Sequence, residues 1–340
     1  MNETKSATNP PPHPPDQLQA LPTFMQRQIL SFFGYQDYTL TGRTCPYLYA
    51  RWKEAVDNKK LPVFVPVDCN TLQAAVKRVE KDDRLAIIVL GTGEHRITGD
   101  YLKISSAMHI VGDPGVPKEK IVVVGDIRFK KGIQGNCHLQ HLTLRQAKGS
   151  GVCGWSSFTM EDVVVEQCGG CGVWALGTGG VGRCTDVQVR HCGYSGVVAS
   201  DGATITFIGA KTTVHHNCRK GDSTAYGLKV EGSDVFCGNP STIQFVSPLL
   251  KEHVALDNGG GGNWGAEWGA GTHQFKTVTV AEMAEMAKVA AAAAAAAAAV
   301  ARGEVRVPID CKTLVEAVNR VHRDDRLTTI VVGTGEHQID

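Results

Sequence analysis

A short pattern recurs in the middle of the chain, and it limits the possible folds more than any other feature. Its three clearest copies are LTLRQAKGSGVCG (142–154), VVVEQCGGCGVWA (163–175) and VQVRHCGYSGVVA (187–199). A fourth, more divergent copy begins at Thr212, so the period is 21 to 25 residues. Self-similarity at a fixed period of this length is typical of solenoids, in which each repeat buries its apolar face only against its neighbours.

The repeats predict strands rather than helices. Apolar residues alternate at the start of each copy, and glycines follow where a tight turn is needed. Strands stacked about 4.8 Å apart would pair every backbone group with the repeats above and below. We therefore predict a mainly β fold, a right-handed parallel β-helix over 65–275. The aligned columns are Leu142, Val163, Val187 and Thr212; Leu144, Val165, Val189 and Val214; Ala147, Cys168, Cys192 and Asn217; and Gly151, Gly172, Gly196 and Gly227.

An N-terminal cap helix is predicted just before the repeats. Leu72, Ala75, Val76 and Val79 lie at i, i+3, i+4 and i+7, which is one face of a helix over 71–82. Asn70 or Thr71 can cap it. The apolar run 85–90 that follows predicts a strand buried on both faces, and Gly91 and Gly93 end it.

The end of the chain repeats this cap. Residues 307–339 match 65–97 at a constant offset of 242, with 22 of 33 positions identical. We interpret 303–340 as a partial second copy of the cap helix and first strand, produced by a tandem duplication that is cut short. Between the copies, 276–302 is alanine-rich and predicts a helix or linker. At the other end, 1–17 predicts a disordered, proline-rich arm and 18–58 a helical segment.

Composition excludes several classes of function. The net charge is +1, so no global basic field indicates a nucleic acid partner. No run of 18 strongly apolar residues predicts a membrane span. The N-terminus lacks the apolar region of a secretory signal, so the 11 cysteines indicate reduced thiols in a cytoplasmic or nuclear protein.

Two resemblances to known families extend this interpretation. The cap helix, the Gly91-Thr92-Gly93 turn and the glycine-punctuated repeats resemble the pectin-lyase-like superfamily. That fold carries lyases, hydrolases, epimerases and non-enzymes, so the resemblance implies the fold and not the activity.

The segment 18–58 resembles an F-box, through Leu21-Pro22, Ile29-Leu30, Phe33, Tyr38, Cys45 and Trp52. An F-box docks on the Skp1-like adaptor of a cullin ubiquitin ligase. The resemblance therefore implies an adaptor-binding surface, whose residues would be Leu21, Pro22, Ile29, Leu30 and Phe33. The alternative is a generic helical subdomain that seals the end of the solenoid.

Catalytic candidates are sparse. Asp162 and Asp186 share a column with His141 and Lys211, and could form an acid pair or a Ca²⁺ site of a polysaccharide lyase or hydrolase. We favour a solvated turn column balanced by His141 and Lys211.

Metal binding is suggested by Cys168-Gly-Gly-Cys171, with Cys153, Cys184, His191 and Cys192 near in register. A second CxxC is missing, and the thiols follow from the repeat itself, so we favour stacked buried cysteines and expect no metal and no cofactor.

The polar residues of the repeats fall into columns that point outward, and they favour binding rather than catalysis. One column alternates in charge, with Arg145, Glu166, Arg190 and His215. The next column is Gln146, Gln167, His191 and His216. Trp264 and Trp268 could stack on a sugar or seal the C-terminal end of the solenoid.

We expect a recognition protein, a substrate receptor of an SCF-type ubiquitin ligase that binds an unknown protein or glycan. We assign its target face to Arg190, His191, His215 and His216. The alternatives are a polysaccharide-active enzyme using Asp162 and Asp186, and a structural repeat protein without a specific ligand.

Overall fold

The computed structural model describes residues 61–232, 240–267, 275–285, 288–289, 292, 304–307, 313–323 and 329–332. The chain divides into two compact units, 1–277 and 278–340, which are described separately. The predicted arm 1–17 and the F-box-like segment 18–58 lie outside the described residues. No helix in the described part of the chain is long and apolar enough to cross a membrane.

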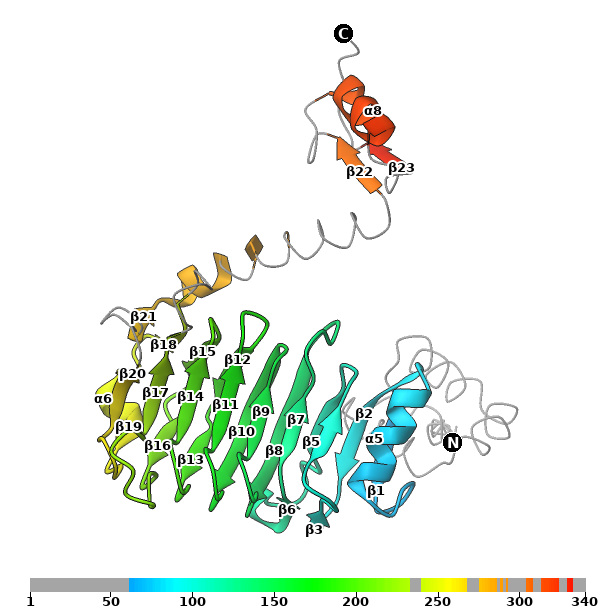
Figure 1. Cartoon of the computed structure of the whole chain (residues 1–340). Coiled ribbons are helices and arrows are strands. Elements are labelled where there is room, and N and C mark those ends of the chain that lie inside the picture. The colour runs from blue at the N-terminus through cyan, green and yellow to red at the C-terminus, as the bar shows by residue number, and fades with distance from the viewer. Residues whose placement is uncertain are drawn as a thin grey trace, which may run out of the picture. The chain divides into compact units, whose positions relative to one another are not determined.

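The first unit is a parallel β-solenoid of about six turns, as predicted (Figure 1). Its larger sheet has 14 strands, and neighbouring strands such as β1 and β2, β8 and β10, and β12 and β15 pair parallel. These strands are β1 (Leu61–Val65), β2 (Leu85–Leu90), β3 (Gly93–Arg96), β5 (His109–Gly112), β6 (Ile121–Val124), β8 (Cys137–Arg145), β10 (Phe158–Glu166), β12 (Val181–Thr185), β13 (Gln188–Arg190), β15 (Thr204–Ile208), β16 (Thr213–His215), β18 (Thr242–Val246), β19 (Ala255–Leu256) and β21 (Phe275–Val278).

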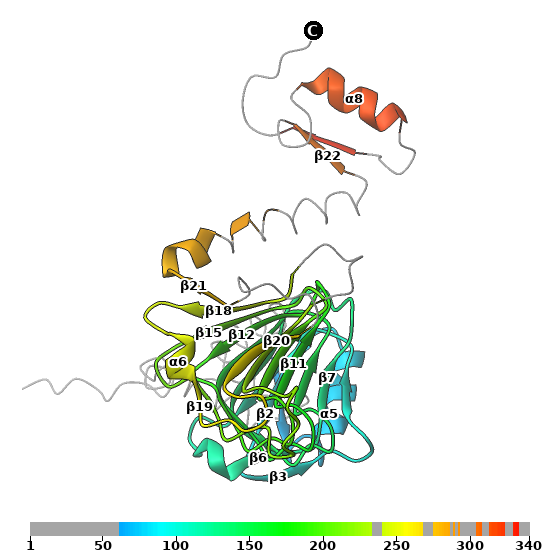
Figure 2. The same cartoon turned by 60° about the vertical axis from the view of Figure 1, so that its left-hand side comes forward.

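A seven-stranded sheet closes the coil (Figure 2). Its strands are β4 (Leu102–Ile104), β7 (Ile127–Phe129), β9 (Val152–Gly154), β11 (Val173–Leu176), β14 (Val197–Ser200), β17 (Leu228–Glu231) and β20 (Trp264–Glu267). Among the described residues of the first unit, three helices accompany the strands: α5 (Leu72–Lys81), the 3-10 helix η1 (Lys118–Lys120) and α6 (Lys251–Val254).

The predicted register is confirmed by the strand pairs. Val163 lies opposite Leu142, and Val165 lies between Leu144 and Val189 on the neighbouring coils. Val189 in turn lies opposite Val214. All of these side chains are fully buried, so each coil stacks apolar groups on the same groups of the next coil. Burial of a valine or leucine side chain contributes about 1.5–3 kcal/mol, which makes the stacked interior the main source of stability.

The corners of the coil use left-handed backbone conformations. The strands β8 and β10 bend at His141 and Asp162, whose φ angles are 52° and 53°. The next coil has Asp186 at this corner, with φ 52°. Aspartate and histidine are among the side-chain-bearing residues that best tolerate such a conformation.

The fourth residue of this corner column differs from the prediction. Thr185 lies opposite Ile208 and Gln188 opposite Thr213, so the later coil has two extra residues at the corner. Gly209, with φ 84°, takes the left-handed position, and Lys211 lies inside the longer turn. The alignment that placed Lys211 in the column was therefore wrong. It counted residues back from the strand that follows the corner, and such a count does not reveal two residues inserted before that strand.

The cap helix α5 also forms as predicted. It packs against β1 and β2, and Leu72, Ala75, Val76 and Val79 are its buried residues (Figure 1). The hydroxyl of Thr71 accepts a hydrogen bond from the backbone nitrogen of Ala74 at 3.2 Å, so Thr71 is the N-cap.

The second unit repeats this cap with the same pairing. Its elements are β22 (Glu304–Val307), α8 (Leu314–Arg323) and β23 (Thr329–Val332). Val305 pairs with Ile330, as Val63 pairs with Ile88 in the first unit. Positions that lie 242 residues apart in the sequence therefore take equivalent places in the two caps. The helix α8 begins and ends at the positions equivalent to the first and last residues of α5.

Packing between coils predicts a sharp difference between two glycines. A methyl group on Gly172 would lie 2.7 Å from the carbonyl oxygen of Gly196 and would overlap Val189. We expect Gly172→Ala to lower the free energy of unfolding by about 2–3 kcal/mol in chemical denaturation. Gly115→Ala is the control, because its methyl would approach only the Asp113 carboxylate, at 3.3 Å. Equal stability of the two variants would contradict the tight stacking described here.

Candidate functional site

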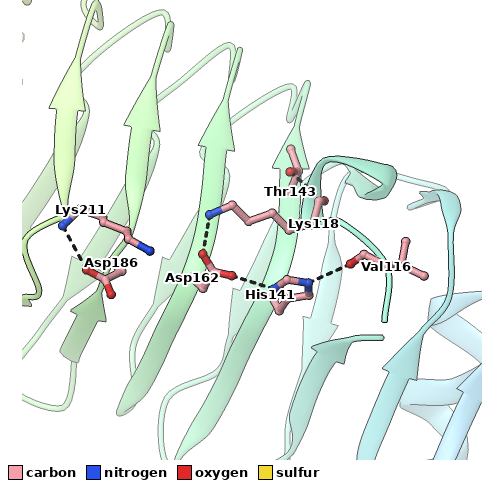
Figure 3. Close-up of polar contacts among 7 residues, drawn as sticks. All are labelled: Val116, Lys118, His141, Thr143, Asp162, Asp186 and Lys211. Atoms are coloured by element: carbon pink, nitrogen blue, oxygen red, sulfur yellow. Dashed lines mark hydrogen bonds and ion pairs between the residues drawn. The ribbon is translucent and has the colours of Figure 1, made fainter. Parts of the chain in front are cut away.

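The corner column holds the two carboxylates that the sequence singled out. Asp162 and Asp186 lie on adjacent coils, because the pairs on either side of them are in register (Figure 3). Each carboxylate, however, is already bound by its own chain. The amide nitrogen of Lys211 donates to Asp186 Oδ1 at 3.1 Å.

Asp162 is held by the side chains of Lys118 and His141. Its Oδ1 accepts from Lys118 Nζ at 2.5 Å, and its Oδ2 lies 2.7 Å from His141 Nδ1 (Figure 3). The other ring nitrogen of His141 lies 2.9 Å from the carbonyl oxygen of Val116. The imidazole of His141 therefore bridges a carboxylate oxygen of β10 and a backbone oxygen just before η1.

The electrostatics of Asp162 argue against a role as a general acid. Partial burial pushes the pKa of Asp162 up, but the hydrogen bonds from Lys118 and His141 outweigh burial and hold this pKa below its usual value. A general acid needs a carboxyl group that is still protonated near the working pH. The arrangement instead ties η1, β8 and β10 together at one corner of the solenoid. Lys118 comes from η1, and its partnership with Asp162 was not predicted from sequence.

The predicted cysteine column is buried. Cys168 and Cys192 are 2% and 0% exposed. Burial raises the pKa of Cys184 and of Cys171 to about 12, and that of Cys153 to about 11, so these thiols are neutral at pH 7. Among the described residues, no group of three or more His, Cys, Asp or Glu is placed to hold a metal ion.

The predicted target-face residues do lie together. The ring of His191 lies 6.2 Å from that of His215 and 5.4 Å from that of His216, between ring centroids. Burial, followed by the charge of His216, lowers the pKa of His191 and of His215. Arg190 is engaged by Glu166 at 2.9 Å, so the column alternates in charge at this point.

A hollow on the seven-stranded sheet was not foreseen from the sequence. Its volume is about 160 Å³, and it lies over the outer face of β11, β14 and β17. Two aromatic and three charged side chains dominate its lining: Trp174, Tyr194, Asp222, Lys229 and Glu231. Smaller groups complete it, from Cys171, Ser195, Val198, Thr224 and Ala225.

An extended turn builds one wall of the hollow. Twelve residues, 216–227, connect β16 to β17, whereas six residues, 191–196, make the same connection one coil earlier. Backbone hydrogen bonds anchor the long turn, from Cys218 to Tyr194 at 2.9 Å and from Gly261 to Ala225 at 2.8 Å. The length difference is visible in the sequence, but the hollow that it makes depends on side chains from three coils.

The charged groups of the hollow are ordered by their own contacts. Lys229 is only 8% exposed and its Nζ lies 2.8 Å from Glu231 Oε1. Hydrogen bonds from the backbone and hydroxyl of Thr224 lower the pKa of Asp222, which is therefore ionised at neutral pH. Trp174 donates from Nε1 to Ser200 Oγ at 2.9 Å, which fixes the orientation of its ring.

The outer faces of both sheets carry straight rows of side chains. On the seven-stranded sheet, paired residues form the row Lys103, Arg128, Cys153, Trp174, Val198 and Lys229. On the larger sheet, the row is His109, His138, Thr159, Arg183, Thr206 and Gln244. Strand alternation within each copy was the signal that could have identified both rows.

We compared the chain with protein-family models, curated proteins and solved structures, and none of them matches it. The pectin-lyase-like and F-box resemblances therefore stay predictions. The predicted adaptor-binding residues lie outside the described part of the chain, namely Leu21, Pro22, Ile29, Leu30 and Phe33. Trp268 also lies outside it. Trp264 is described, in β20 at one edge of the seven-stranded sheet, with Lys251 Nζ 5.0 Å from its ring centroid.

The Asp162 corner gives a pH-dependent stability prediction. Because the folded pKa is lowered, the stabilisation is complete above the usual carboxyl pKa of about 3.9 and is lost as pH falls through the folded value. We expect Asp162→Asn to lower the free energy of unfolding by about 1 kcal/mol at pH 7, after discounting for partial exposure. The difference from the wild type should shrink below about pH 4 in urea denaturation.

The control keeps the backbone conformation. Asp201 is an exposed aspartate with φ 58°, so Asp201→Asn tests the same substitution at a left-handed position. Equal effects of the two substitutions at pH 7 would show that the contacts of Asp162 with Lys118 and His141 contribute no stability.

Proposed function

We propose that this chain is a non-catalytic recognition protein that presents a target to a ubiquitin ligase. The observation that carries the proposal is the hollow over β11, β14 and β17, which is lined by aromatic and charged side chains. The F-box-like segment supports the ligase connection through its sequence alone. The two parts together would make the protein a substrate receptor of an SCF-type ligase.

The contents of the hollow favour recognition of an extended polypeptide. Trp174 and Tyr194 offer aromatic contact area, and aromatic residues dominate binding energy at protein interfaces. Asp222, Lys229 and Glu231 supply both signs of charge within one small volume. A side chain of the target would enter the hollow, while the rest of the row on the seven-stranded sheet would follow the target backbone.

The rival enzyme hypothesis has less support in the geometry. Both oxygens of Asp162 are occupied by Lys118 and His141, and its pKa lies below the usual value. The hypothesis would require substrate to displace these partners.

Adaptor binding tests the ligase half of the proposal. We expect full-length chain to capture purified Skp1, and the double substitution Ile29→Ala/Leu30→Ala to reduce capture about tenfold or more, as loss of an apolar hot spot does. The matched control is Val67→Ala/Val181→Ala, which removes two valines that are 80% and 44% exposed. Absence of Skp1 binding by the wild type would reject the ligase connection and leave recognition by the β-helix to be tested alone.

Peptide selection tests the target half. We expect peptides selected from a random display library on the wild-type chain to bind Trp174→Ala about tenfold more weakly, measured by fluorescence anisotropy. Tyr101→Ala is the control, because Tyr101 is 40% exposed and lies at the first strand of the same sheet, away from the hollow. Selected peptides that bind both variants as well as the wild type would place recognition elsewhere.

A further inference from the structure

The second unit repeats the apolar residues that are buried in the first unit, and two of them are exposed among the residues that the structure describes. We call residues 61–90 the first cap and residues 304–332 the second cap. Eight apolar residues of the first cap are buried, and the second cap keeps seven of them unchanged and replaces the eighth, Leu90, by Val332. The eight are Val63, Val65, Leu72, Ala75, Val76, Val79, Ile88 and Leu90.

The two caps differ in what covers this face. In the first cap, β2 pairs with β5, and Val76 and Leu90 are 1% and 0% exposed. In the second cap, the equivalent residues Val318 and Val332 are 47% and 48% exposed. Within the described part of the chain, β23 pairs only with β22. An open strand edge beside exposed apolar side chains is a template for another strand.

We propose that the second cap is a docking surface for the first coil of the β-helix of a second copy of this chain. The first cap shows which surface such a face fits, because its strand β2 pairs with β5 of the first coil. The docked arrangement would pair β23 with β5 of the second copy, in the register of β2. Thr329 would then take the place of Ile87, which lies opposite His109.

The first cap competes for the same coil. It is joined to that coil by its own chain, which gives it an effective concentration in the millimolar range. Exchange between copies replaces contacts by equivalent contacts, as in domain swapping. The wild-type chain therefore caps itself in most molecules, and docking of the second cap becomes the major state when the first cap is weakened. A disulfide trap also captures the minor docked state of chains whose first cap is intact.

Weakening the first cap provides the main test. We expect Val76→Asp to convert the full-length chain from monomer to dimers and larger species by size-exclusion chromatography with light scattering. Adding Val318→Asp should return it to monomer. Val76→Asp/Val289→Asp is the matched control, since Val289 is a 63% exposed valine of the same unit, outside the second cap, and this variant should stay oligomeric. A monomeric Val76→Asp chain, or oligomers that persist with Val318→Asp, would overturn the proposal.

A cysteine test keeps the proposal falsifiable if Val76→Asp fails to fold. Two differently tagged full-length chains, one with His109→Cys and the other with Thr329→Cys, are mixed in a glutathione redox buffer. Adjacent paired strands place Cα atoms within the range that a disulfide spans. We expect a disulfide-linked heterodimer that is lost with His109→Ser, which controls for the native cysteines. No heterodimer above this control would overturn the proposal.

Discussion

Hydrogen bonding between successive coils is the interaction on which this structure depends. A strand can pair with the coils above and below only if every turn returns the chain to the same register. The corners meet this requirement with left-handed residues such as Asp162 and Asp186, and with glycines where neighbouring backbone leaves no space. The apolar interior follows from this register, since equivalent positions of consecutive coils must fill the same layer.

That dependence explains how much of the fold could be predicted from the sequence. The register of Leu142, Val163 and Val187 was predictable because a two-residue alternation fixes which side chains face inward. The cap helix was predictable from the spacing of its buried residues. Lys211 was misplaced because its coil has an insertion, and a local count cannot show which residue takes the corner.

The candidate site was less predictable for a related reason. The column of Asp162 and Asp186 could be drawn from the repeat, but Lys118 reaches Asp162 from 44 positions earlier in the chain. The hollow needs Trp174, Tyr194 and Lys229 from three successive coils, together with the fold of the turn 216–227. Such contacts depend on three-dimensional placement between repeats, whereas the repeat pattern describes only what each coil shares with the others. The polar groups at the corners satisfy one another, which leaves the sheet faces and the hollow as the surfaces suited to recognition.

The turn 216–227 has a broader consequence for how such a protein can change. Val189 pairs with Val214 before it and Val198 with Lys229 after it, so a connection twice the length of its predecessor leaves the strand register undisturbed. Contacts in a solenoid are made mainly between neighbouring coils, and stability is therefore close to a sum of local terms. A connection of this kind can vary in length and sequence while the scaffold stays constant. If the protein acts in recognition as proposed, selectivity for a target could be changed by transplanting this one turn rather than rebuilding the fold.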